Sequence, residues 1–104
     1  AIEKEYLIKN ASTQGLLITN LLNEKFKSNK NIVSIRSLGL MIGIELSMPC
    51  VEIVNIALEK KLLINVTSES VIRLLPPLII NKKEAKMLTD RLIKTIEIFL
   101  KNYE

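Results

Sequence analysis

The sequence predicts one α+β domain, a two-layer arrangement in which helices cover one side of a mostly antiparallel sheet in the order α-ββ-α-ββ-α. Three observations support this fold class. Long segments with apolar residues at helical spacing lie at both ends of the chain, and the short apolar runs between them come in pairs around turn residues. The length of 104 residues suits one hydrophobic core and is too short for two.

Residues 2–28 predict a long first helix. The larger side chains that fall near one face of it are Leu7, Gln14, Leu17, Leu21 and Phe26. Gly15 interrupts the helix, and a glycine inside a helix costs about 1 kcal/mol relative to alanine. We therefore expect another part of the chain to pack closely against Gly15.

A hairpin is expected next, with strands at residues 32–38 and 40–47. Gly39 lies between them and permits the positive φ of a tight connection. Side chains alternate across a strand, so one face of the second strand carries a row of apolar residues. This row is the predicted core face: Leu40, Ile42, Ile44 and Leu46.

The central part of the chain predicts a short helix followed by a second strand pair. Residues 49–61 begin with proline, which suits a first helical turn because its missing N–H costs nothing there. Strands are expected at residues 62–66 and 71–75, around the polar turn TSES. Two prolines then remove backbone donors and end the second strand.

The last helix is predicted to begin at Asn81, which forms a capping-box pattern with Glu84. The asparagine side chain takes the place of the usual serine or threonine. An apolar stripe at helical spacing follows for more than five turns: Ala85, Leu88, Leu92, Ile96, Phe99 and Tyr103.

Composition argues against several classes of function. The net charge of +4 comes from lysines spread along the chain among glutamates, and no aromatic residue lies beside a basic cluster, so we expect no nucleic-acid binding. No apolar run approaches the roughly 20 residues of a membrane span, so no membrane association is expected. The single cysteine, Cys50, is interpreted as a small core or surface residue and fits a reducing, cytoplasmic location.

The chain offers no catalytic or metal-binding constellation. Histidine is absent, so the commonest general base and the Ser-His and Cys-His pairs are missing. One cysteine and no histidine cannot form a structural zinc site, and neither GxxxxGK[ST] nor GxGxxG occurs. We therefore expect no catalytic residue, no cofactor-binding residue and no metal ligand in this chain.

Arg73 is the one candidate binding residue, because it stands alone in the apolar run VIRLLPPLII. Alternation places it on the strand face opposite Ile72 and Leu74. One interpretation is an edge-strand arginine whose stem covers apolar surface while its head reaches water. The other is a ligand-binding guanidinium, whose planar fork suits a carboxylate or a phosphate. Residue pattern alone leaves both open.

Three stretches together resemble the C-terminal part of class III, pyridoxal-phosphate-dependent aminotransferases, most closely the branch that acts on acetylornithine. They are IRSLGLMIGIEL (35–46), ALEKKLLINVTSESVIRLLPPLII (57–80) and the NKKEAKMLTDRL segment that follows. The resemblance extends over essentially all 104 residues. One departure is Ser37, where the family pattern Arg-Gly-x-Gly has its first glycine.

This resemblance implies that residues 1–104 form the small C-terminal domain of a fold-type I aminotransferase, with a leading helix at 1–30 and an α/β subdomain at 31–104. Arg73 matches the arginine that holds the α-carboxylate of the amino-acid or oxo-acid substrate. The missing large domain of the same polypeptide would supply the Schiff-base lysine and bind pyridoxal 5′-phosphate, so the isolated chain is expected to be inactive. Ala1 in place of methionine fits a fragment or a processed product.

The intact enzyme implied by this resemblance is a cytoplasmic homodimer. It would move the amino group of N-acetylornithine, or of succinyldiaminopimelate, to 2-oxoglutarate in arginine or lysine biosynthesis. Other hypotheses stay open at this point. The chain could belong to an ornithine- or 4-aminobutyrate-type aminotransferase, could be a free-standing module that binds an acidic metabolite through Arg73, or could be a dimer-forming structural module.

Overall fold

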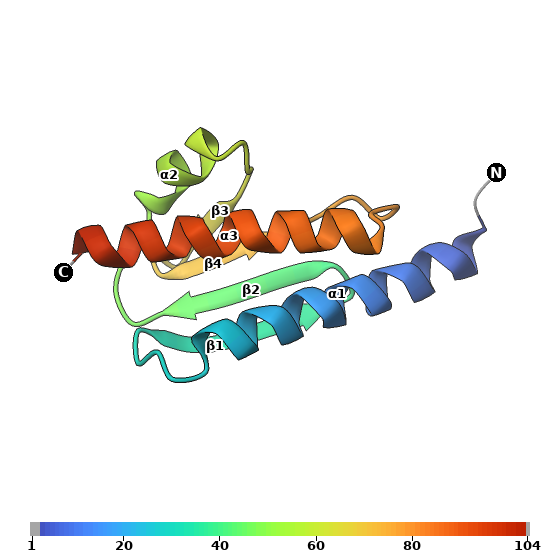
Figure 1. The fold of residues 1–104 in the computed structure, drawn as a ribbon, viewed down its shortest axis with the longest axis horizontal. Helices are drawn as coiled ribbons and strands as arrows, with labels where there is room; N and C mark the ends of the chain where they lie inside the picture. The colour runs from blue at the N-terminus through green and yellow to red at the C-terminus, as the bar shows by residue number, and fades with distance from the viewer. Residues whose placement is uncertain (1–2, 104) are drawn as a thin grey trace.

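Three helices and four strands make up residues 3–103, the part of the chain that the computed structural model describes (Figure 1). They are α1 (Lys4–Phe26), β1 (Ile32–Leu38), β2 (Met41–Leu46), α2 (Ile53–Glu59), β3 (Asn65–Thr67), β4 (Val71–Leu74) and α3 (Lys82–Tyr103). The predicted order α-ββ-α-ββ-α is confirmed. Residue 2, where the first helix was expected to begin, lies outside the described residues.

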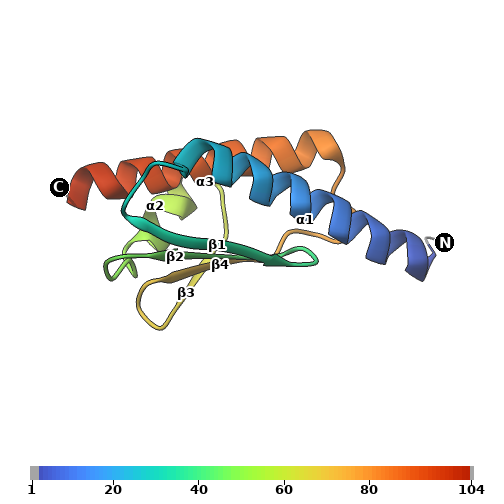
Figure 2. The same cartoon turned by 90° about the horizontal axis from the view of Figure 1, so that it is seen from below.

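The four strands form one sheet in the order β1-β2-β4-β3, and every neighbouring pair is antiparallel. Strands β2 and β4 are therefore the interior strands. The long helices α1 and α3 lie across one face of the sheet, with α2 beside α3 (Figure 2). The opposite face carries no helix, and we call it the open face.

The hydrophobic core lies between the sheet and the helices. The predicted core row of β2 is confirmed, because Leu40, Ile42, Ile44 and Leu46 are all buried. The helices contribute fully buried aliphatic side chains to the same core, among them Ile18, Leu22, Leu92 and Ile96. Branched aliphatic residues pack well on a pleated surface, which explains why the interior strands are rich in them.

Gly15 of α1 packs directly on the β1–β2 turn, as the sequence predicted. A Cβ atom at Gly15 would lie 1.9 Å from the carbonyl oxygen of Gly39, a separation that no real Cβ contact has. Gly39 itself has φ of 60°, in the left-handed region that favours glycine. The two glycines therefore let the helix backbone and the turn backbone touch.

The capping box at the start of α3 is also confirmed. The backbone N–H of Glu84 donates to Oδ1 of Asn81 at 2.8 Å, and the backbone N–H of Asn81 donates to Oε1 of Glu84 at 3.0 Å. Two otherwise unpaired donors of the helix terminus are thus satisfied reciprocally.

The predicted contact face of α1 was partly wrong. Leu7, Leu17 and Leu21 are only half-buried, whereas the buried stripe consists of Ala11, Gln14, Gly15, Ile18, Leu22 and Phe26. The physical reason is the close approach at Gly15, which fixes the face of α1 that meets the sheet and leaves Leu17 and Leu21 at the flanks of that face. At the far end of the chain, Tyr103 was expected in the stripe of α3 but is 59% exposed.

The short helix α2 begins later than predicted, at Ile53 rather than at residue 49. The backbone N–H of Cys50 donates to the carbonyl oxygen of Glu69 at 2.7 Å, which ties this segment to the turn between β3 and β4. The backbone N–H groups of Ile53 and Val54 then donate to the carbonyl oxygens three residues earlier, which is a tighter turn than that of an α-helix. Proline therefore precedes the first helical turn, and the helix starts only after a turn at residues 51–52.

Strand β3 was predicted at residues 62–66 and is found at Asn65–Thr67. Lys61 has φ of 59°, and the backbone N–H of Leu62 donates back to the carbonyl oxygen of Ala57 at 2.9 Å. These residues close the C-terminus of α2, in the way that a left-handed residue commonly does. They are therefore not available to pair in the sheet.

Candidate functional site

Arg73 lies on the open face of the sheet, in the middle of β4. Its neighbours in the strand, Ile72 and Leu74, are 0% and 4% exposed on the core face, whereas Arg73 is exposed. The predicted alternation is confirmed. The idea of an edge-strand arginine was wrong, because β4 is an interior strand and Arg73 pairs with Gly43 on one side and with Asn65 on the other.

Two neighbouring side chains hold the Arg73 guanidinium. Its Nε–H donates to Oγ1 of Thr67 at 3.2 Å, and its Nη1 lies 4.0 Å from the sulfur of Met41. In the described part of the chain, no carboxylate lies within 4.0 Å of Arg73. The Nε–H is therefore occupied by Thr67, while the guanidinium keeps further N–H donors that can bind a carboxylate.

Two hollows of the open face meet at Arg73 and Met41. One has a volume of about 450 Å³ and is lined by Met41, Leu63, Ile64, Asn65, Thr67, Arg73, Leu74 and Leu75. The other has a volume of about 420 Å³ and is lined by Arg36, Ser37, Leu38, Met41, Gly43, Val71 and Arg73. Both combine apolar walls with a few polar groups, the usual make-up of a small-molecule site.

The chain that leaves β4 is held in place by α1. The Asn10 side-chain amide donates to the carbonyl oxygens of Leu78 and Ile80, both at 2.9 Å. Gln14 supports Asn10 by donating its amide to Oδ1 at 3.3 Å. The sequence predicted that the two prolines end the strand, but it gave no signal for these hydrogen bonds, whose partners lie 68 and 70 positions apart in the chain.

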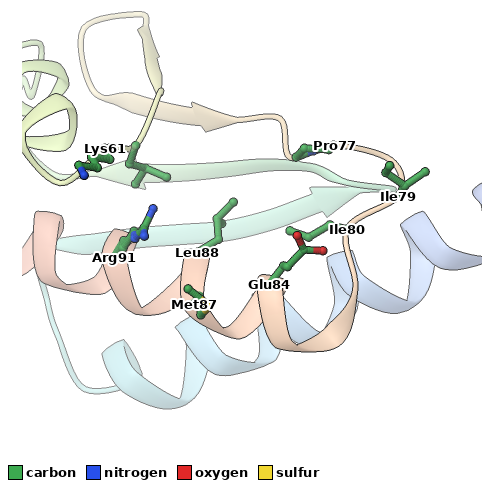
Figure 3. A pocket seen from close by; sticks show the side chains of 9 residues that line it. Lys61, Pro77, Ile79, Ile80, Glu84, Met87, Leu88 and Arg91 are labelled. Atoms are coloured by element: carbon green, nitrogen blue, oxygen red, sulfur yellow. The ribbon is translucent and has the colours of Figure 1, made fainter.

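A third hollow, shown in Figure 3, lies between α3, the segment at residues 77–80 and the end of α2. Its volume is about 410 Å³ and its walls are mostly apolar. The Glu84 carboxylate accepts the capping-box hydrogen bond, and Lys61 and Arg91 lie at the other end of the hollow (Figure 3). This hollow shares no lining residue with those at Arg73, so it is a separate feature.

Other candidate groups do not form a reactive site. Cys50 is 1% exposed, and burial raises the pKa of its thiol, which disfavours the nucleophilic thiolate. Within residues 3–103, no three His, Cys, Asp or Glu side chains gather in a way that could hold a metal ion. No helix in the described part of the chain is long and apolar enough to cross a membrane.

Comparison with known proteins decides the family. Residues 1–96 match the family described as Aminotransferase class-III. The chain belongs to the class III aminotransferases. It is 41% identical over 101 residues to the acetylornithine aminotransferase of Nitrosomonas europaea, with 97% of this chain and 26% of that protein covered. It is 43% identical over 100 residues to acetylornithine aminotransferase 1 of Bordetella bronchiseptica, covering 96% of this chain and 25% of that protein.

Solved structures of class III aminotransferases share the fold. The ornithine aminotransferase of Plasmodium yoelii superposes with a TM-score of 0.83 at 28% identity, covering 91% of this chain and 27% of that chain. The acetylornithine aminotransferase of Elizabethkingia anophelis superposes with a TM-score of 0.81 at 25% identity, covering 88% of this chain and 25% of that chain. The chain thus spans about a quarter of the length of its relatives and has the fold of an aminotransferase C-terminal region.

Class III aminotransferases use pyridoxal phosphate, and the residues that line the two hollows at Arg73 do not fit the requirements of that cofactor. It needs a lysine for its aldehyde, a partner for its ring nitrogen and a cradle for its phosphate. Neither hollow beside Arg73 is lined by a lysine, an aspartate or a glutamate. These two hollows therefore lack the side chains that would hold the cofactor.

Ser37, which departs from the family pattern, fits its position without strain. It lies inside β1, where it is paired with Ile42 of β2 and is exposed to solvent. The residues with positive φ in the described chain do not include it. The structure therefore needs no glycine there, and the tight connection depends on Gly39 alone.

Proposed function

We propose that residues 1–104 are the small C-terminal domain of an acetylornithine aminotransferase and that Arg73 binds the α-carboxylate of its substrates. Relatives about 40% identical bear that name, and they cover nearly all of this chain. The observation that carries the proposal is the state of Arg73: a guanidinium fixed by Thr67, without a carboxylate partner in the described chain, between two hollows.

Such an arginine contributes to catalysis by positioning. Two parallel hydrogen bonds fix both the place and the plane of a carboxylate. The α-amino or α-oxo carbon next to that carboxylate is then held in one orientation, and correct orientation removes much of the entropic cost of reaction. When pyridoxal phosphate is bound by the intact protein, it serves as the electron sink of the transamination.

The reaction we propose moves the amino group of N-acetylornithine, or of succinyldiaminopimelate, to 2-oxoglutarate in arginine or lysine biosynthesis. The large domain of the same polypeptide binds the cofactor, the intact protein is a cytoplasmic homodimer, and this chain alone is inactive. One observation favours a covering partner for the open face. Leu38, Leu63 and Leu75 are 85%, 80% and 69% exposed beside the two hollows, and exposed apolar side chains that gather on one face favour a covering partner.

Ornithine aminotransferase activity is the second candidate, because the structure superposes on ornithine aminotransferases as well as on acetylornithine aminotransferases. The full-length polypeptide that contains this chain should be assayed with acetylornithine, succinyldiaminopimelate and ornithine as amino donors. The donor with the highest kcat/KM identifies the substrate, and we expect acetylornithine.

The role of Arg73 is tested in the same assay. In an Arg73→Gln variant, the KM for 2-oxoglutarate and for the amino donor should both rise by about 10-fold or more, because a charge-assisted pair is lost. Arg91→Gln is the matched control, since Arg91 lies on α3 and lines neither hollow at Arg73. Unchanged KM and kcat in Arg73→Gln would refute the role. Micromolar binding of 2-oxoglutarate to the isolated chain, measured by calorimetry, would instead favour a free-standing module.

A further inference from the structure

Gly43 is a glycine that the fold itself does not require. It lies in the interior of β2, where glycine weakens a strand because it adds no packing and costs backbone entropy. Its φ is not in the left-handed region, and a Cβ atom placed on it would meet nothing within 4 Å. A glycine in such a position commonly marks a place where a ligand or another backbone approaches the strand.

The register of the sheet places an arginine on each side of this glycine. Arg36 of β1 is directly opposite Gly43, and Gly43 is directly opposite Arg73 of β4. Residues opposite each other in antiparallel strands point to the same face, so both arginines stand on the open face. Their Cα atoms are two strand spacings apart, or about 10 Å. All three residues line the hollow of about 420 Å³.

The charges of this row lack a partner within the described chain. Neither Arg36 nor Arg73 has a carboxylate within 4.0 Å in residues 3–103. Glu45 is two positions from Gly43 on the same strand face, yet it forms no such pair with either arginine. Two guanidiniums on either side of a glycine, whose backbone no side chain covers, favour the binding of an anion between them.

We propose that Arg36 is a second carboxylate-binding residue, and that Arg36, Gly43 and Arg73 form one cradle for the substrate α-carboxylate. The carboxylate lies over Gly43, where the absent side chain lets it approach the sheet, and the two guanidiniums hold it from opposite sides. This inference rests on the proposed role of Arg73 and extends it to Arg36. The ligand class is a 2-oxo acid or an amino acid, bound through its α-carboxylate.

The test measures binding of 2-oxoglutarate to the full-length polypeptide that contains this chain, by isothermal titration calorimetry without an amino donor, so that nothing turns over. The variants are Arg36→Gln, Arg73→Gln, their double variant and Gly43→Ala, with Arg91→Gln as control. We expect each arginine variant to bind about 10-fold more weakly or worse. The double variant should lose less than the product of the two single losses, because both side chains hold the same group.

Gly43→Ala keeps both charges and is the sharpest variant. Its methyl group has free space in the chain and alanine costs less backbone entropy than glycine, so the unfolding temperature should stay equal or rise, whereas 2-oxoglutarate should bind several-fold more weakly. Wild-type affinity in Arg36→Gln, together with a loss in Arg73→Gln, would overturn this inference and leave the proposed function standing. Wild-type affinity in both would overturn the proposed role of Arg73 as well.

Discussion

Replacing Gly15 with alanine should destabilise the fold, although alanine is the better helix former. The new methyl group would start 1.9 Å from the carbonyl oxygen of Gly39 and must retreat to at least 3.0 Å. Because the obstacle is backbone in a tight turn, no side-chain rotation relieves it. The helix must lift away from the hairpin, which loosens the packing of Ile18 and Leu22, both fully buried on the same face.

The size of the effect follows from two opposing contributions. Overpacking costs about 1 to 3 kcal/mol, and a backbone obstacle belongs at the upper end of that range. The gain in helix propensity is about 1 kcal/mol. We therefore expect the free energy of unfolding to fall by about 2 kcal/mol in Gly15→Ala.

Urea denaturation of the 104-residue chain, followed by far-ultraviolet circular dichroism, measures this difference. Ser12→Ala is the matched control, because Ser12 is exposed on the same helix and its replacement should leave stability equal or slightly higher. A Gly15→Ala chain as stable as the wild type, or more stable, would refute the argument from close backbone contact.

Three further predictions follow from the contacts around the site. Thr67→Val removes the hydroxyl that accepts from Arg73 Nε, so the KM of the full-length enzyme for 2-oxoglutarate should rise by a few fold. Thr67→Ser keeps a hydroxyl, so an equal rise of KM in that variant would contradict the hydrogen-bond explanation. Asn10→Ala removes both donors to the loop after the prolines and should lower the free energy of unfolding by about 1 to 2 kcal/mol in urea denaturation. Burial raises the pKa of the Cys50 thiol, so the stability that the protonated thiol contributes is present below the unfolded-state pKa and is lost as pH rises through the folded-state pKa. The free energy of unfolding of Cys50→Ala should therefore fall less at alkaline pH than that of the wild type, and identical pH profiles of the two proteins would contradict the argument from burial.

The parts of the fold that could be predicted are those in which the deciding residues are close in sequence. Asn81 and Glu84 are three positions apart and cap the helix with each other, so their pattern alone predicts the start of α3. The alternation of β2 likewise identifies its core face within one strand. The long-range bond between Cys50 and Glu69 could not be predicted because nothing near Cys50 in the sequence indicates its partner.

The same distinction applies to the candidate site. Arg73 could be found in the sequence because a charged residue inside an apolar run stands out against its neighbours. Arg36, Gly43 and Thr67 are ordinary residues in their own segments and become a site only through the register that aligns β1, β2, β4 and β3. The pairing of β2 with β4 joins segments that lie far apart in the chain, so no local pattern indicates that Gly43 comes to lie opposite Arg73.

The two faces of the sheet explain why binding and stability can be tested separately. In β2 and β4, core residues such as Ile44 and Ile72 alternate with open-face residues such as Gly43 and Arg73. In these two interior strands the core face is buried by the helices, so its residues determine whether the chain folds. The open face meets no helix, so a change there leaves the core contacts in place. A Gly43→Ala variant that unfolds readily would therefore contradict this division. A variant that folds normally and binds 2-oxoglutarate more weakly would show that the glycine of this interior strand serves ligand binding and not folding.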